Sequence, residues 1–295
     1  MTTTSTQTNT TSGALLADAT RLGGVELIVT DLERSIDFYT QVIGLTVHGR
    51  DELAAALGAG GEDIVTLRLD AAARQPGRHA GLYHYALLFP SRAELARAGR
   101  RVAEHRVPID GASDHHTHEA IYLPDPDGIG VELAADRARD RWPDVRSQQF
   151  LSGGPAPLDV GDLFATIAGE PPHTHAGDGL RVGHVHLHVG DLDASTRFYR
   201  DGLGFEATNS TPHAVFVSAG GYHHHVAFNL WRGMRVGPAP ASGVVGLHHW
   251  TLDTADPSER AAVAARLTTI GASVEEHADG GFFARDPAGI AVLVR

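Results

Sequence analysis

The sequence predicts an α+β protein built from four copies of one β-α-β-β-β module. A repeated strand-and-helix segment, alternating apolar residues after each copy, and a polar stretch in mid-chain predict this class. The 295 residues leave room for two domains, each with its own core. Hydrophobic residues make up 42% and charged residues 20%, as in an ordinary soluble protein.

The clearest repeat joins Val25–Tyr39 (VELIVTDLERSIDFY) and Val185–Tyr199 (VHLHVGDLDASTRFY). In both segments, apolar residues with a period of two stop at an Asp that can cap a helix. The predicted helix closes with Phe-Tyr, and a glycine follows at Gly44 and Gly204, where the chain must turn back. These segments therefore start two of the modules.

Two further starts are weaker. In YHYALL and HHWTL, a candidate helix cap, Ser91 or Asp256, falls seven residues after a histidine, His84 or His249. Alternating strands are expected to complete each module at residues 64–69, 120–133, 214–229 and 281–294. The four modules are expected at residues 22–72, 81–135, 181–231 and 245–295.

The modules predict two domains, at residues 21–136 and 181–295. Residues 137–180 are rich in Pro, Gly and Asp and predict a linker with one short helix. Residues 1–20 have neither the basic region nor the apolar run of a secretory signal, so they predict a disordered tail on a cytoplasmic protein.

Composition excludes several classes of function. The net charge of -12 argues against a surface for nucleic acid or anionic membrane, and no stretch reaches the length of a membrane span. The absence of cysteine rules out disulfides and thiolate metal ligands. Any metal site must therefore be built from histidine and carboxylate side chains.

Two motifs carry side chains suited to such a site. The pattern HxxxxxIYxxDPxGxxxE runs from His115 to Glu132 and ends in a strand that carries one carboxylate on an apolar background. The pattern GHVHLHV places His184, His186 and His188 on one face of a strand, because alternate residues share a face. Together the motifs suggest a site for a divalent transition metal.

These residues carry a family resemblance. A His seven residues before a helix cap, with DPxGxxxE in the last strand of the module, resembles the vicinal oxygen chelate superfamily of glyoxalase I, bleomycin-resistance proteins and extradiol dioxygenases. The segments LYHYALLFPSRAELARA and GGYHHHVAFNLW are similar to the two-domain catechol-2,3-dioxygenase family of the Bacillus CatE type. The likeness covers nearly the whole chain after residue 20. The His115–Glu132 segment nearly matches the extradiol-dioxygenase signature and departs only at Ser113.

The resemblance implies two half-open β-barrels, each made of two modules, with metal ligands on the first and last strands of the modules. In chain order the equivalent pairs of positions are Gly24 and Val65, His84 and Glu132, His184 and His225, and His249 and Leu293. Two pairings of the modules stay open.

If consecutive modules pair, one site holds His84 and Glu132, and the other holds histidines alone, with His249 among its ligands. If the second and third modules pair, His84, Glu132 and His184 form the two-histidine, one-carboxylate set that suits Fe(II). His225 is then a fourth ligand or an acid–base group. We favour the second pairing because all the equivalent positions that carry a residue unable to bind a metal then lie in the other barrel.

Three further residues are candidates for the chemistry. His115 and Tyr122 match the active-site His and Tyr of the extradiol signature, which implies roles beside the metal or in proton transfer. His186 shares the face of His184, so it is expected to line the pocket or to pair with polar groups in the core.

The resemblance implies an Fe(II)-dependent extradiol dioxygenase, with Mn(II) or another divalent metal as an alternative, that acts on a small catechol-like aromatic substrate with O2. A glyoxalase-like isomerase or lyase, or a binding protein of the bleomycin-resistance type, is the alternative, because one scaffold hosts several chemistries. Neither nucleic acid nor membrane is expected as a partner, and a homo-oligomer is possible.

Overall fold

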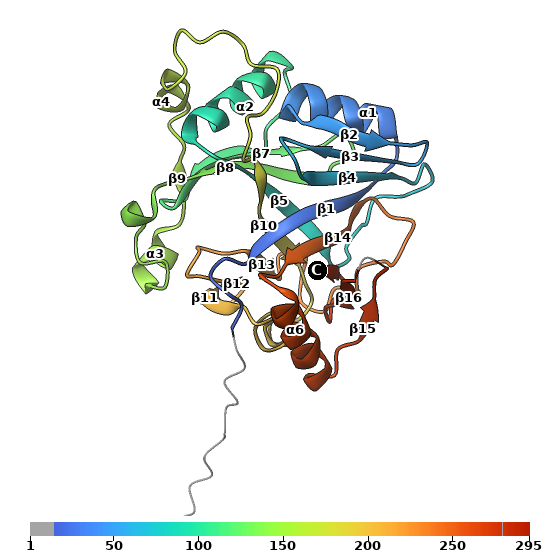
Figure 1. Ribbon diagram of the computed structural model, residues 1–295. Helices are drawn as coiled ribbons and strands as arrows, with labels where there is room; N and C mark the ends of the chain where they lie inside the picture. Colours follow the sequence, from blue (N-terminus) through green and yellow to red (C-terminus); the bar gives the residue numbers. More distant parts are fainter. Residues whose placement is uncertain (1–14, 279) are drawn as a thin grey trace, which may run out of the picture.

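The strands form two mixed sheets in this computed structural model, which describes residues 15–278 and 280–295 (Figure 1). The first sheet, in spatial order, contains β15 (Val274–Glu276), β16 (Phe282–Arg285), β17 (Ala291–Val294), β14 (Gly246–Asp253), β1 (Arg21–Val29), β4 (Asp63–Leu69), β3 (Ala54–Gly58) and β2 (Thr46–Arg50). The second contains β11 (Glu206–Thr211), β12 (Ala214–Ser218), β13 (Val226–Asn229), β10 (Arg181–His188), β5 (Gly81–Phe89), β8 (Gly130–Asp136), β7 (His118–Pro124), β6 (Gly111–Asp114) and β9 (Ala156–Pro157).

Each sheet therefore combines one module from each half of the chain. The first and fourth modules meet where β1 pairs with β14, and the second and third meet where β5 pairs with β10, both antiparallel. We call these the 1–4 sheet and the 2–3 sheet. The second of the two pairings considered above is the observed one.

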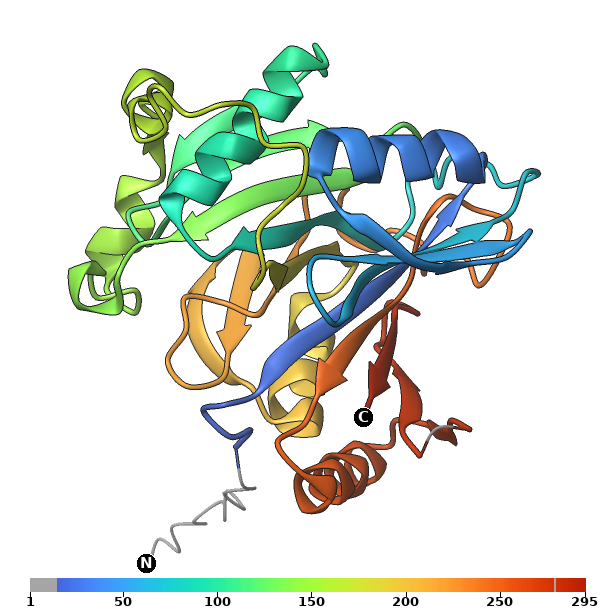
Figure 2. The same cartoon turned by 45° about the horizontal axis from the view of Figure 1, so that its top comes forward.

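The helices begin where the sequence predicts them. Asp31, Ser91, Asp191 and Asp256 each accept a hydrogen bond at a helix N-terminus from a backbone N–H of the first turn. The helices are α1 (Leu32–Asp37) with a π-helical continuation (Phe38–Ile43), α2 (Arg92–Glu104), a 3-10 turn (Arg139–Arg141), α3 (Gln148–Gly153), α4 (Val160–Ala165), α5 (Leu192–Thr196) with a π-helical continuation (Arg197–Leu203), and α6 (Pro257–Thr269). In both views α1 and α2 lie at the same end of the molecule (Figure 2). No described helix is long and apolar enough to cross a membrane.

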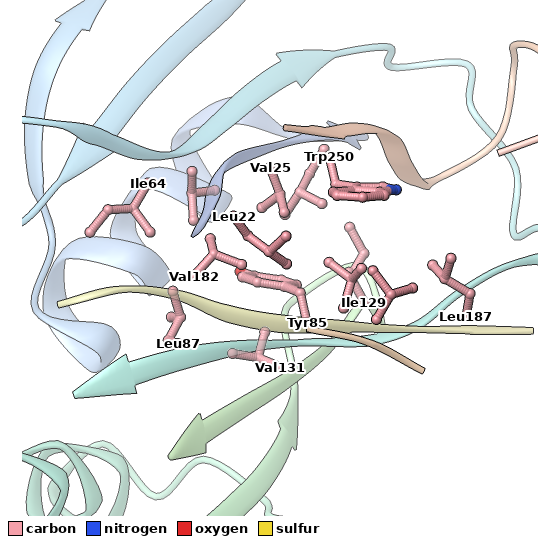
Figure 3. Close-up of a cluster of buried hydrophobic side chains, with 14 of the residues drawn as sticks. Leu22, Val25, Ile64, Tyr85, Leu87, Ile129, Val131, Val182, Leu187 and Trp250 are labelled. Carbon is pink, nitrogen blue, oxygen red and sulfur yellow. The ribbon is translucent and has the colours of Figure 1, made fainter. Parts of the chain in front are cut away.

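The main core lies between the two sheets. Figure 3 shows Val25 and Trp250 of the 1–4 sheet meeting Tyr85, Val131 and other apolar side chains of the 2–3 sheet. Because strand residues alternate between faces, the intervening residues of β5, β8 and β10 face away from this core. That opposite face of the 2–3 sheet carries the histidines.

The predicted tail and linker are more ordered than expected where the structure describes them. Residues 1–14 of the predicted tail lie outside the described residues, but Leu16 is buried, and its N–H donates to Gly204 O at 3.0 Å. The predicted linker holds two short α-helices and a 3-10 turn rather than one short helix, and its strand β9 pairs with β6. The linker is therefore an edge of the 2–3 sheet.

Candidate metal centre

Three neighbouring strands bring His84, Glu132 and His184 together. Ala86 of β5 lies opposite Glu132 of β8 on one side and opposite His184 of β10 on the other. His84 is two residues before Ala86 and so shares its face. The backbone register alone therefore places the three side chains next to one another.

The three side chains converge on one carboxylate oxygen. His84 Nε2 lies 3.1 Å and His184 Nε2 2.9 Å from Glu132 Oε2. One ligand atom from each residue lies within 4.8 Å of the other two, and all three residues are buried. Two imidazoles and a carboxylate form a donor set for a divalent transition metal.

A fourth imidazole borders the cluster. His118 Nε2 lies 3.2 Å from Glu132 Oε1, yet this oxygen is buried and has no hydrogen-bond partner among the described residues. A buried carboxylate oxygen without a donor is costly, whereas a metal ligand needs its lone pairs free. His84, Glu132 and His184 therefore fit a bound divalent metal.

The protonation states also suit a metal. Burial by itself would raise the pKa of Glu132, but the rings of His184, His118 and His84 hold it well below its ordinary value. Burial lowers the pKa of His184, against the opposing effect of Glu132. An ionised carboxylate and neutral imidazole are the forms that bind metal.

His115, Tyr122 and His186, which are expected beside the site, line a cavity that His84, Glu132 and His184 also line. His115 Nε2 and the Tyr122 hydroxyl are hydrogen-bonded at 2.8 Å. His186 Nε2 lies 2.9 Å from Asn229 Nδ2, and Asn229 Oδ1 accepts from a backbone N–H. The Asn229 amide therefore donates to His186, whose remaining proton is on Nδ1.

The expected position of His225 is wrong. Its Nδ1 accepts a hydrogen bond from Ala219 N at 3.1 Å, and its ring lies against Tyr222, with centroids 4.7 Å apart. The ring does not line the cavity. The expectation assumed alternation along a strand from residue 214 to 229, but β13 begins only at residue 226.

His223 and His224 line the cavity instead. The His224 ring lies 4.2 Å from that of His184, centroid to centroid, and the two Nδ1 atoms of His223 and His224 are 2.9 Å apart. Sequence reasoning also missed His118. Because His118 and Tyr122 lie four residues apart on β7, period-two alternation places both on the face of Glu132 and is the signal that identifies His118.

His249, the alternative ligand, lies in the 1–4 sheet. Its Nδ1 is 2.9 Å from His248 Nδ1, and His248 Nδ1 is 3.1 Å from Glu26 Oε1. This second cluster differs in charge from the first, because Arg68 Nε donates to the same Glu26 oxygen at 2.8 Å. An arginine on the carboxylate opposes cation binding there.

His84, Glu132 and His184 form part of the wall of a cavity of about 560 Å³. Such a volume suits a small organic molecule. The wall contains imidazoles and Tyr122 together with apolar residues, among them Leu123, Phe150 and Phe216, and the Phe216 ring lies against that of His224, with centroids 5.3 Å apart. The cavity therefore has room for an aromatic compound beside His84, Glu132 and His184.

Comparisons with known proteins follow the same division of the chain. The family model described as Glyoxalase/Bleomycin resistance protein/Dioxygenase superfamily matches residues 21–133 and 181–294. Catechol-2,3-dioxygenase of Bacillus subtilis (strain 168) is 38% identical over 273 residues, which cover 91% of this chain and 94% of that protein.

Solved structures show the same fold. A putative dioxygenase from Bacillus subtilis subsp. subtilis str. 168 superposes with a TM-score of 0.67 at 15% identity, covering 96% of this chain and 86% of that one. Glyoxalase I from Zea mays gives a TM-score of 0.58 at 17% identity, covering 94% and 92%. At such identities the likeness concerns the fold alone.

Proposed function

The chain belongs to the glyoxalase, bleomycin-resistance protein and dioxygenase superfamily, and we propose that it is an Fe(II)-dependent extradiol dioxygenase that cleaves a catechol-like aromatic compound with O2. Mn(II) is the alternative metal. The buried carboxylate of Glu132, with two imidazole Nε2 atoms within 3.1 Å of its Oε2, carries the proposal. The 38% identity to a catechol-2,3-dioxygenase supports the choice of reaction.

His84, Glu132 and His184 would hold the metal. When bound, Fe(II) would supply the Lewis acidity and the one-electron chemistry toward O2 that amino-acid side chains lack. In the overall reaction the ring C–C bond beside the diol breaks and both atoms of O2 enter the product. The balance requires no external reductant.

The cavity side chains would bind the substrate and move its protons. Burial raises the pKa of Tyr122, which keeps the phenol protonated, and lowers the pKa of His115 to about 4, which keeps the imidazole neutral. Tyr122 would donate to His115 Nε2 and present its oxygen to a substrate hydroxyl. A substrate proton would reach His115 Nε2 through the Tyr122 hydroxyl, and the His224 imidazole, which lines the same cavity, is a second acceptor.

Oxygen uptake tests the proposal. Anaerobically Fe(II)-loaded protein is mixed with catechol in an oxygen electrode, and the ring-opened product is identified by mass spectrometry after reaction under ¹⁸O2. We expect one O2 consumed per catechol and both labelled atoms in the product, with both signals lost in Glu132→Ala. Conversion without O2, or no conversion by protein that retains its metal, contradicts the proposal.

One observation favours a second candidate. His118 Nε2, at 3.2 Å from Glu132 Oε1, offers a fourth protein ligand, and a more fully ligated metal suits a glyoxalase-like isomerase. That enzyme would convert its substrate in the absence of O2. The anaerobic arm of the same experiment therefore separates the two candidates.

A further inference from the structure

The cavity offers no cationic side chain to a ligand. Its described lining contains two carboxylates, Glu132 and Asp110, and neither arginine nor lysine. The whole chain has no lysine. Two of the cavity's imidazoles already have partners: His115 Nε2 is hydrogen-bonded to the Tyr122 hydroxyl, and His186 Nε2 to the Asn229 amide.

Asp110 and two aromatic rings lie at the exposed part of the cavity wall. Asp110 is exposed, Tyr83 and Trp231 are 41% and 56% exposed, and their two rings meet edge to face with centroids 5.2 Å apart. A negative charge there repels anions, and the net charge of -12 acts in the same sense. The aromatic rings offer a neutral aromatic compound an apolar surface.

The linker completes the apolar part of the wall. Val145 and Phe150 lie before and within α3 and face the same cavity as Phe216 of β12. Asn209 Nδ2 donates to Val145 O at 2.7 Å, which ties this segment to β11. This part of the wall therefore comes from a segment outside the four modules.

Two arginines near the cavity line a different hollow. Arg137 and Arg141 line a neighbouring hollow of about 800 Å³ that shares Phe150 with the cavity. Arg137 is already paired, with its guanidinium 2.7 Å from Asp114 and 3.0 Å from Glu119. Phe150 thus belongs to both walls, and these guanidinium groups line the neighbouring hollow but are not among the described residues that line the cavity.

We propose that the cavity selects uncharged catechols with an apolar substituent, which packs against Phe150 and Phe216, and rejects catechols that carry a carboxylate. The inference rests on the proposed function and narrows its substrate. With the diol on the metal, a carboxylate elsewhere on the ring would be desolvated without a cationic side chain to pair with it, beside the exposed negative charge of Asp110. A methyl or phenyl group would be removed from water by the aromatic wall.

Anaerobic binding and turnover test this selectivity. The dissociation constants of 3-phenylcatechol, catechol and 3,4-dihydroxybenzoate are measured by calorimetry on metal-loaded protein without O2, and kcat/KM is measured with O2. We expect kcat/KM for 3-phenylcatechol to exceed that for the benzoate by at least about 100-fold. Equal or tighter binding of the benzoate overturns the inference while ring cleavage still supports the proposed function.

Two variants, one of them with a matched control, test which cavity residues cause the selectivity. Asp110→Lys should improve the benzoate relative to catechol by roughly 10-fold, whereas Glu52→Lys, with the same change in net charge at an exposed residue away from the cavity, should not. Phe150→Ala should weaken 3-phenylcatechol binding more than catechol binding. If both lysine variants shift the ratio equally, or Phe150→Ala changes neither ligand, the cavity wall is not the selector. If no catechol binds, both the inference and the proposed function fail.

Discussion

The 1–4 sheet and the 2–3 sheet share one backbone plan and differ in what they present on it. In both, a bulge leaves one residue unpaired in a central strand, Tyr83 in β5 and His248 in β14. A histidine follows the unpaired residue in each sheet, His84 or His249. Opposite the residue two positions further on, the neighbouring parallel strand carries Glu132 in the 2–3 sheet and Leu293 in the 1–4 sheet. The backbone thus supplies the position, and the side chain decides whether it is a site.

The same comparison explains why the second histidine cluster differs. In the 1–4 sheet the only carboxylate of the cluster is Glu26, which is partly exposed and bound to Arg68. In the 2–3 sheet Glu132 is buried and surrounded by imidazoles, and its Oε1 has no hydrogen-bond partner among the described residues. Burial and an open lone pair, rather than composition, distinguish the two clusters.

The largest expected effect is loss of metal from Glu132→Ala, with Glu26→Ala as its matched control. Removing the carboxylate should weaken Fe(II) binding by at least about 100-fold, since only the two imidazoles of the set remain. Metal content by plasma mass spectrometry after anaerobic loading and desalting measures it. Metal loss in Glu26→Ala instead would place the site in the 1–4 sheet.

Local patterns in the sequence predict much of this architecture. The Asp and Ser caps, the four modules and the common face of His184 and His186 all follow from short-range rules. His225 was misplaced because alternation holds only within a strand, and the loop before β13 breaks it. The sequence also could not predict that the linker lines the cavity, because this depends on a contact between Asn209 and Val145, which are 64 residues apart.

A smaller effect concerns the stability of the 1–4 sheet. Gly24 occupies the position equivalent to His184, and a Cβ there would lie 2.8 Å from Asp63 O, a backbone atom that cannot move aside easily. Gly24→Ala should therefore lower the free energy of unfolding by about 1–3 kcal/mol. Urea denaturation measures the change. Gly49→Ala, where a Cβ meets nothing within 4 Å, is the control and should stay within about 0.5 kcal/mol of the wild type.

The buried histidine His225 of the third module should make the free energy of unfolding depend on pH. Burial lowers the pKa of His225 to about 3 in the folded protein, whereas the unfolded chain takes up the proton near its ordinary value of about 6.5. The unfolded state then binds more protons between these values, so the folded protein loses stability as the pH falls from about 6.5 toward about 3.

His225→Asn tests this contribution, because Asn keeps an acceptor for Ala219 N–H but does not titrate. Between about pH 7 and pH 5, metal-free His225→Asn should lose about 1–2 kcal/mol less unfolding free energy than the wild type. Urea denaturation at the two pH values gives the difference. An identical loss in both proteins would show that His225 is not the group that titrates.

The smallest effect should come from His249→Ala, compared with His84→Ala at the corresponding position of β5. Both histidines follow the bulge residue of their sheet, so replacement removes the same group from the same backbone position. His84 contacts the Glu132 carboxylate, whose other neighbours at 2.9–3.2 Å are imidazoles, whereas the carboxylate beside His249 and His248 is bound to Arg68. Metal content should therefore fall in His84→Ala and stay at the wild-type level in His249→Ala. The reverse result would mean that the shared backbone plan, and not the buried carboxylate, determines which sheet binds the metal.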